Sequence, residues 1–300
     1  MTAVPAEATA AAPPTLARGP HGLLWLTLRV HRTALLSWSA PVAVFSGALL
    51  WAYGPGDDAA RAEYLETGCG AGRPNLGCDM PGPAFERYDY VLGVSGALLA
   101  FLPLLAAAWA GGALIGRELE QGTARLAWVQ SVTPTRWLAA KLAVPAALLA
   151  AGTTATVLLG VWARGADDPN LVGDWYHPET FIGTGPTAVA YALSGLALGA
   201  LAGTALGRAL PAAGAAAAGA LLLRELLERY RPDLWPTVVR DTADGEVPRS
   251  ALQVSGTETL VTLHPPSHFW PIQYVETGVL LALTAAAVVG AFALLRHRAT

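Results

Sequence analysis

Long intervals without a charged side chain divide this sequence into blocks. A membrane-spanning helix needs roughly 20 mostly apolar residues to cross about 30 Å of hydrocarbon. Five intervals without Asp, Glu, Lys or Arg are long enough, and a sixth, 209–223, reaches that length only if Arg224 and Glu228 are partly submerged. The pattern therefore predicts six spans, near 33–56, 90–116, 142–163, 180–207, 209–230 and 275–295.

These apolar intervals are expected to be helical. Hydrocarbon offers backbone amides no water, so each span must satisfy its own hydrogen bonds as a helix. Pro41, Pro103 and Pro145 fall inside predicted spans and are expected to mark kinks. Charged residues make up 14% of the chain and hydrophobic residues 53%, whereas a soluble domain is about 25% charged. The predicted fold class is an all-α integral membrane protein with a single transmembrane domain over 18–300.

The N-terminal region differs from the rest of the chain. Residues 1–17 are rich in Ala, Pro and Thr without an apolar core, so we expect a disordered cytosolic tail and not a signal peptide. Over 18–35, arginines gather on one side of a helix and leucines on the other, which predicts an interfacial helix before the first span. Trp25 lies among the arginines, so the alternative, that this segment begins a long first helix, stays open. The three arginines are Arg18, Arg29 and Arg32.

Basic residues give the expected orientation. With six crossings and the N-terminus in the cytosol, the shorter inner segments hold ten of the 19 Lys and Arg residues and the longer outer segments hold nine. A higher density of positive charge on the inner side favours this orientation. Both termini are then cytosolic, and the loop 54–89 faces outward.

Both cysteines, Cys69 and Cys78, lie in that first outer loop. Eight residues rich in turn formers separate them, and the outer compartment is oxidising, so a disulfide is expected and two free thiols are the alternative. No further metal ligands lie nearby. His264 and His268 could bind a metal from one helix face, but the two prolines between them disfavour a helix. The sequence therefore predicts no metal site.

Glycine recurs every fourth residue in the predicted fourth span. This spacing places the glycines on one helix face, where the backbones of two membrane helices can approach closely. The pattern predicts helix packing and leaves open whether the partner helix belongs to this chain or to a second copy. The four residues are Gly195, Gly199, Gly203 and Gly207.

Two opposite-charge pairs with a spacing of four residues follow the predicted fifth span. They are formed by Arg224 with Glu228 and by Glu225 with Arg229. Residues at this spacing are neighbours on a helix surface. We expect a salt-bridged helix face that extends beyond the bilayer, and a polar lining for a substrate path is the alternative.

No catalytic machinery is evident in the sequence. Nucleotide hydrolysis would need a phosphate-binding loop ending in Gly-Lys-Ser/Thr, but the only lysine, Lys141, lies in Trp-Leu-Ala-Ala-Lys-Leu. Intramembrane enzymes need paired acids, or a nucleophile with a base, at membrane depth. The acid closest to a span is Glu276, at the outer mouth of the last one, and it has no obvious partner. We therefore expect a chain that is not an enzyme and that holds no cofactor.

The most informative segment is the predicted inner loop between the second and third spans, 117–141. Thr123 and Thr133 are predicted helix caps, the second followed by proline, so a short helix should lie within the loop. Charges cluster at its start, close to Trp128 and Val129. A solvated loop is one interpretation, and a surface for a cytosolic partner fits better. The charged residues are Arg117, Glu118, Glu120 and Arg125.

This loop resembles that of the permease subunits of ATP-binding-cassette exporters of the second type, particularly actinobacterial ones. Those permeases show Arg-Glu-x-Glu-x-Gly-Thr after the second span, then Gln-x-Val-Ser/Thr, and Arg-Trp-Leu-x-x-Lys leading into the third. Pro134 stands where a basic residue is common in the family. The stretch from His264 to Gly278, ahead of the last span, is also similar to the family. The matching loop residues are Arg117, Glu118, Glu120, Gly122, Thr123, Gln130, Val132, Thr133, Arg136, Trp137, Leu138 and Lys141.

The resemblance implies a six-span subunit that works as a dimer in the plasma membrane with two copies of a separate cytosolic ATPase. ATP and Mg would then be bound by the ATPase and not by this chain. Since exposed charges contribute under about 1 kcal/mol to stability, removing Glu118 and Glu120 is expected to leave folding near normal. The loop would act as the coupling helix, through Arg117, Glu118, Glu120, Gly122, Thr123, Arg125 and Arg136.

Export across the plasma membrane is the function that the resemblance implies, with the substrate leaving between two permease copies. Lipids, antibiotics and peptides are all compatible with it, and no residue selects among them. No nucleic acid partner is expected. A non-transporting membrane sensor or scaffold is the alternative from a different class of protein.

Overall fold

A computed structural model describes residues 32–66, 82–129, 132–165, 169–241, 247, 250–257 and 259–299. Contacts divide the chain into Met1–Pro41 and Val42–Thr300, and the architecture given below is that of the second unit. Of the first unit, the structure describes the beginning of one helix. The predicted tail 1–17, most of the predicted interfacial helix 18–35, and both Cys69 and Cys78 lie outside the described residues, so the disulfide stays a prediction.

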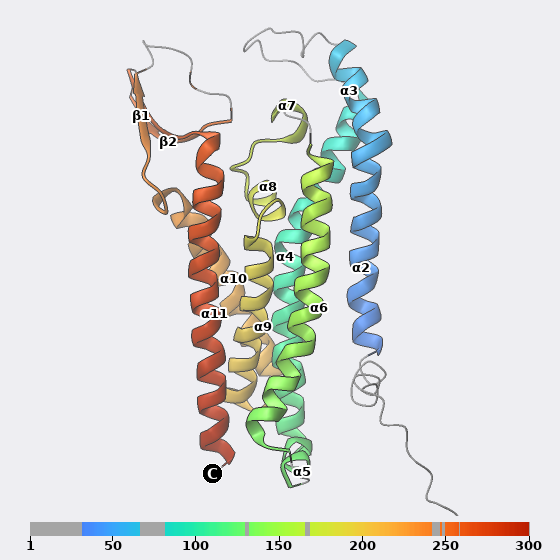
Figure 1. The fold of residues 1–300 in the computed structure, drawn as a ribbon, viewed down its shortest axis with the longest axis vertical. Coiled ribbons are helices and arrows are strands. Elements are labelled where there is room, and N and C mark those ends of the chain that lie inside the picture. Colours follow the sequence, from blue (N-terminus) through green and yellow to red (C-terminus); the bar gives the residue numbers. More distant parts are fainter. Residues whose placement is uncertain are drawn as a thin grey trace, which may run out of the picture. The chain divides into compact units, whose positions relative to one another are not determined.

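Six helical segments among the described residues are long and apolar enough to cross a membrane, which confirms the predicted fold class (Figure 1). They are Leu36–Glu66, Pro83–Glu120, Pro134–Ala163, Thr187–Leu206, Ala209–Asp233 and Pro266–Arg298. Their long helices are α2 (Arg32–Trp51), α4 (Pro83–Glu120), α6 (Pro134–Ala163), α9 (Thr187–Leu206), α10 (Ala209–Tyr230) and α11 (Phe269–Ala299).

Shorter elements connect the spans. The α-helical ones are α3 (Asp57–Glu66), α5 (Thr123–Val129), α7 (Pro169–Val172) and α8 (Pro178–Gly183). A π-helical turn, η1 (Ala52–Gly56), and two 3-10 turns, η2 (Arg231–Asp233) and η3 (Pro266–His268), complete them. Within Val42–Thr300, α5 and the C-terminus lie at one end and the β-strands at the other (Figure 1). We call these the α5 end and the sheet end.

Two predicted spans differ in detail from the structure. The first does not stop near residue 56, because η1, which contains Pro55, joins α2 directly to α3. The fourth, predicted as one interval over 180–207, is divided into α8 and α9 at Gly185 and Pro186. The residue before a proline is disfavoured in the helical conformation, which accounts for the break at this position.

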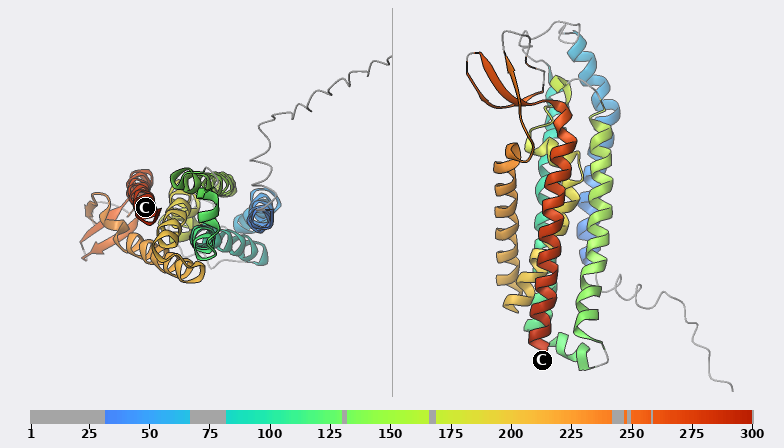
Figure 2. Two further views of the ribbon diagram at one scale, coloured as in Figure 1. Left: turned by 90° about the horizontal axis from the view of Figure 1, so that it is seen from below. Right: turned by 60° about the vertical axis from the view of Figure 1, so that its left-hand side comes forward.

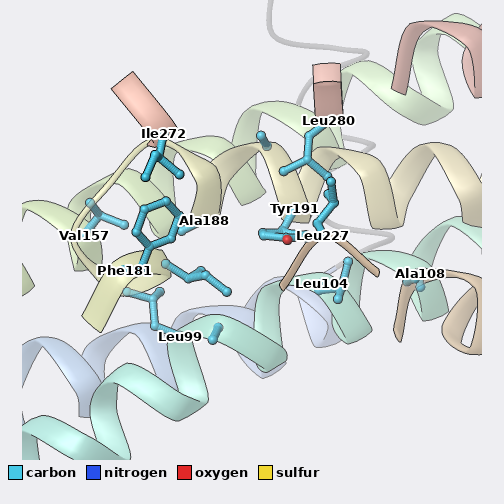
Figure 3. Packing of buried hydrophobic residues seen from close by; sticks show 14 of the residues in the cluster. Leu99, Leu104, Ala108, Val157, Phe181, Ala188, Tyr191, Leu227, Ile272 and Leu280 are labelled. Atoms are coloured by element: carbon cyan, nitrogen blue, oxygen red, sulfur yellow. The ribbon is translucent and has the colours of Figure 1, made fainter. Parts of the chain in front are cut away.

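Helix α9 lies at the centre of the second unit. It packs against α4, α11, α10 and α6 (Figure 2). The most apolar stretch of α9 is 61% buried inside the protein, a larger share than in any of the other five spans. Tyr191 of α9 belongs with Phe181, Leu104 and Ile272 to a large buried cluster (Figure 3). The near-uniform apolar sequence of α9 therefore reflects burial among other helices of this chain.

Glycines let α9 and α4 approach backbone to backbone. A Cβ atom placed on Gly199 would lie 2.6 Å from the Ala108 carbonyl oxygen and 2.7 Å from the Gly112 amide nitrogen. Gly195 and Gly203 also lie against α4. The partner helix of these three glycines thus belongs to the same chain, a point that the sequence left open.

The fourth glycine of the predicted series has a different position. Gly207 ends α9 in the left-handed conformation, with φ 63°, and its amide donates to the Gly203 carbonyl at 3.0 Å. A Cβ there would meet the guanidinium group of Arg298, on α11. This residue closes the helix where the chain turns into α10, because glycine tolerates a positive φ that other residues rarely adopt.

A small antiparallel sheet makes the all-α prediction incomplete. Its strands are β1 (Val238–Asp241), β2 (Leu252–Gly256) and β3 (Leu260–His264), in the order β1-β3-β2. Val238 pairs with Leu263, and Leu252 pairs with His264, with an irregularity between Gln253 and Ser255. Each strand has only four or five residues and both edge strands are largely exposed, so no long alternating pattern marks them in the sequence.

Candidate functional site

The segment between α4 and α6 forms a helical hairpin at the α5 end, with α5 across its tip (Figure 1). Helix α4 closes at Gln121 and Gly122, and Gly122 has φ 72°. Thr133 is the predicted cap of α6: its hydroxyl accepts from the Arg136 amide at 3.3 Å, and Pro134 is the first helical residue. Local sequence therefore fixes where both long helices end.

The predicted cap at Thr123 is wrong. Thr123 is the first residue of α5, and its hydroxyl donates to the Glu118 carbonyl oxygen at 3.3 Å, back towards α4. Gly122, at the preceding position, makes the turn because its positive φ favours glycine. The short helix exists where the sequence placed it, but Thr123 ties it to the preceding helix.

Glu118 joins α4 to α6. Its carboxylate accepts from the Trp137 indole nitrogen at 3.0 Å and from the Lys141 ammonium nitrogen at 2.5 Å. Both charged side chains are about three-quarters shielded from solvent, with exposures of 27% for Glu118 and 23% for Lys141. Charge-assisted hydrogen bonds in a shielded site are stronger than exposed ones. The only lysine of the chain therefore serves this contact.

Glu120 joins the same hairpin to α10. Its carboxylate oxygen Oε2 accepts from the amide of Ala209, the first residue of α10, at 3.0 Å. The first amides of a helix have no partner within the helix, and a negative charge there is favourable. Glu118 and Glu120 are thus not free surface charges, and these contacts argue against the expectation that both can be removed with little effect on folding.

A buried cluster fixes the orientation of α5. Ala124 is fully buried, and the Trp128 and Trp137 rings meet edge to face with centroids 5.9 Å apart. Leu138 and Leu295, both fully buried, belong to the same cluster. Edge-to-face aromatic pairs add to the energy of burial alone. Because α5 is held on this side, its opposite face must point away from the bundle.

That opposite face is apolar and basic. Val129 is 86% exposed and Leu126 is 63% exposed. Three arginines of the same hairpin are also exposed, one each on α4, α5 and α6. Large exposed apolar side chains next to charges are typical of interaction sites. We define the α5 surface as Arg117, Arg125, Leu126, Val129 and Arg136.

The structure therefore separates the predicted loop residues into two groups. Glu118 and Glu120 hold helices together, and Gly122 and Thr123 lie at the turn from α4 into α5. Arg117, Arg125 and Arg136 are exposed to solvent. Leu126 is not among the residues that the loop sequence marks. The spacing of Ala124 and Trp128, four residues apart on the buried side, was the signal that Leu126 and Val129 would point outward.

A second cluster of charges lies at the sheet end and corrects the prediction that Glu276 has no partner. Arg231 donates to the Glu276 carboxylate through Nε at 2.8 Å and through Nη2 at 3.2 Å. The Tyr191 hydroxyl donates to the same carboxylate at 2.7 Å. Glu276 is fully buried and Arg231 is 4% exposed. The sequence could not pair residues that lie 45 and 85 positions apart.

Neighbouring aromatic and charged groups complete that cluster. The Arg231 guanidinium lies 4.2 Å from the Phe181 ring centre, and Arg224 lies 3.9 Å from that of Phe101. Arg224 also pairs with Glu228 at 2.8 Å, as its spacing predicts. The Arg224 side chain is only 7% exposed, so this pair is not the salt-bridged face beyond the bilayer that the sequence predicts, and Arg224 is instead submerged in the protein. Cations above aromatic rings are stabilised further when they are desolvated.

Two histidines meet beside this cluster although they do not share a helix. The Nδ1 atoms of His264 and His268 are 3.0 Å apart, and His264 Nε2 lies 2.9 Å from the Pro232 carbonyl oxygen. A carbonyl can only accept, so His264 Nε2 carries the hydrogen, and in the neutral imidazole the His264 Nδ1 atom then accepts from His268. Among the described residues, no group of three possible metal ligands is found.

The loops at the sheet end are joined through Asp174. The Ser250 hydroxyl donates to the Asp174 carboxylate, and the Trp175 indole donates to the Ser250 carbonyl at 2.6 Å. Ser250 has φ 59°, a conformation that non-glycine residues adopt at a cost. Burial, together with a hydrogen bond to Asp174, raises the pKa of the Tyr176 hydroxyl to about 12.

Comparison with protein families decides the class of the chain. The family described as ABC-2 membrane transporter related matches residues 39–231, which include the hairpin with α5 and most of the spans. The chain belongs to this family. No curated protein and no solved structure matches it.

Membership of the ABC-2 membrane transporter related family gives the hairpin a context. Membrane components of this family lack catalytic domains and generally work with an ATPase partner. The match ends at residue 231, so it does not include β1–β3 or α11. The hairpin and its exposed face lie wholly within the matched residues.

Proposed function

We propose that this chain is the permease subunit of an ATP-binding-cassette exporter of the second type, of the kind found in actinobacteria. It moves a substrate across the plasma membrane with energy from ATP that a separate cytosolic ATPase hydrolyses. The ATPase binds ATP and Mg, and this chain binds neither. The observation that supports this most is the α5 surface, which projects an exposed apolar and basic face from a firmly seated hairpin.

The seating of α5 suits the transmission of force. Glu118 connects the two arms of the hairpin, α4 and α6, and Glu120 connects α4 to α10. A partner that displaces α5 must therefore displace α4, α6 and α10 together. Packed helices respond to such a displacement as units, since their interfaces are bistable and not continuously deformable. The hairpin would thus act as the coupling element between ATPase and spans.

The orientation follows from the same surface. A cytosolic ATPase can reach the α5 surface only if the α5 end faces the cytosol. Arg296 and Arg298 lie near the C-terminus at this end, in agreement with the enrichment of basic residues on the cytosolic side. The sheet end then faces outward. A second permease copy, identical or related, would complete the substrate path, as the family resemblance implies.

Replacing Val129 by aspartate should abolish binding of the ATPase without affecting the fold. Val129 is 86% exposed, so the change leaves the protein core intact, but it places a charge in the centre of an apolar contact. We expect the variant to keep its melting temperature and lose at least about 90% of the co-purifying ATPase, because one buried unpaired charge costs several kcal/mol.

The matched control is Val239→Asp, a change of the same chemistry at a residue of β1 that is 60% exposed at the sheet end. It should retain the ATPase. Retention of the ATPase by Val129→Asp, or equal losses in the two variants, would show that the α5 surface is not the docking site.

A further inference from the structure

Helix α10 is held at its two ends by two different carboxylates. At the α5 end, Glu120 accepts from the Ala209 amide at 3.0 Å. At the sheet end, Arg231, directly after α10, donates to Glu276 of α11 at 2.8 Å. Between these points α10 runs along α4 and α9, and α11 lies on another side of α9 (Figure 2). The Arg231–Glu276 ion pair is therefore a principal link between α10 and α11 among the described residues.

The helix is close-packed against α4 and can follow its movements. A Cβ on Gly112 would lie 2.7 Å from the Ala213 amide nitrogen, and one on Gly116 would lie 2.8 Å from the Arg208 carbonyl carbon. Backbones this close leave no room for sliding without moving both helices. A displacement of α4 at the hairpin is therefore passed on to α10 along its first half.

At the sheet end of α10, the chain changes from an α-helix to a 3-10 turn and could act as a hinge. The helix ends at Tyr230 and passes into the 3-10 turn η2, which contains Pro232. The Pro232 carbonyl accepts from His264 of β3, at 2.9 Å, next to the Arg231–Glu276 contact. Two adjacent residues of η2 are thus held, Arg231 by Glu276 of α11 and Pro232 by His264 of the strand that precedes it. Changes of direction are absorbed at the ends of elements such as this one.

The chemistry of the ion pair favours two discrete positions. Glu276 is fully buried and Arg231 almost so. Glu276 accepts from Arg231 and from Tyr191, and Arg231 donates to Glu276 while its guanidinium lies against the Phe181 ring. A buried ion pair gives little net stability over apolar side chains, but separating its members without water is strongly unfavourable. The contact is therefore either fully made or broken with solvent admitted, and partial opening is disfavoured.

We propose that the Arg231–Glu276 ion pair is a reversible contact that holds α10 to α11 in this conformation and separates when the ATPase binds ATP. This rests on the proposed function. A displacement of α5 is transmitted to α10 through Glu120 and through the glycine contacts between α4 and α10. The ion pair at the opposite end of α10 then determines when α10 separates from α11 on the outward side. Glu276 and Arg231 are then positioning residues for transport.

Spin labels on Tyr230→Cys and Gly278→Cys test this in the complex of permease and ATPase. Tyr230 is exposed at the end of α10, and a side chain at Gly278 of α11 meets nothing within 4 Å. Pulsed electron resonance should show a separation that rises by about 5 Å, the scale of a one-turn shift, when ATP is trapped. Equal separations with and without ATP, in a complex that hydrolyses ATP, would overturn the ion pair's role and leave the proposed function standing.

Glu276→Gln should show the longer separation even without ATP, and Glu225→Gln, an exposed carboxylate of α10, should behave as wild type. A Glu276→Gln separation equal to that of wild type would mean that the ion pair only stabilises the fold, and would refute the proposal. Should Glu276→Gln not fold, the double change Arg231→Leu with Glu276→Leu provides the same comparison, because it leaves no charge unpaired. Failure of any ATPase to bind the wild-type chain would instead reject the proposed function, and this inference with it.

Discussion

Replacing Gly199 by leucine should prevent α4 and α9 from packing, and the protein should fail to yield a folded species in detergent. Even a Cβ atom at this position would lie 2.6 Å from one backbone atom of α4 and 2.7 Å from another, and neither can move aside as a side chain could. Overpacking commonly costs about 1–3 kcal/mol where side chains can adjust, and we expect a larger loss here. Size-exclusion chromatography and thermal unfolding would measure it.

The control lies on α4 itself. Gly93 is exposed, and a side chain there meets nothing within 4 Å, so Gly93→Leu should elute and melt as wild type. If Gly199→Leu were as stable as Gly93→Leu, the backbone contact between α4 and α9 would not exist as described. The comparison separates close helix packing from the general effect of a larger apolar side chain in a membrane helix.

Glu118→Ala should loosen the hairpin that carries α5. The change removes the partner of the Lys141 ammonium group and that of the Trp137 indole, both of which are largely shielded from solvent. Leaving such groups without a partner costs about 1–3 kcal/mol each, and the partial exposure of Lys141 places its share at the lower end. We expect a clearly lower melting temperature, together with an altered environment of Trp128 and Trp137 in tryptophan fluorescence.

Arg125→Ala is the matched change on the exposed side of α5. Arg125 belongs to the α5 surface, so its replacement should leave both the melting temperature and the tryptophan fluorescence unchanged. Equal stability of Glu118→Ala and Arg125→Ala would mean that Glu118 does not connect α4 to α6. This pair of variants also distinguishes residues that build the hairpin from residues that would contact the ATPase.

The spans could be predicted because their cause is local. A charge-free interval of sufficient length needs no knowledge of the rest of the fold, and the four-residue spacing of Gly195, Gly199 and Gly203 is visible in a single helix. The cap at Thr133 was also correct, since it depends on three neighbouring residues. These features are set by short stretches of chain.

Other features depend on residues that are far apart in the sequence. Glu276 has no partner close to it in the sequence, because Arg231 and Tyr191 come from other elements. Glu118 and Glu120 looked like surface charges until α6 and α10 were placed beside them. The sheet escaped prediction because β1, β2 and β3 are too short to show a period. Each of these required the tertiary arrangement.

A photoreactive amino acid in place of Val129 tests the central claim most directly. With light applied to intact cells, we expect a covalent product between this chain and a protein that carries an ABC ATPase phosphate-binding loop, identified by mass spectrometry. The same amino acid in place of Val239, at the sheet end, should give no such product. Capture of the ATPase from position 129 alone would also show that the α5 end faces the cytosol. A position-129 product that contains a kinase or a transcription factor and no ATPase, or no product at all, would contradict the account and favour a non-transporting sensor or scaffold.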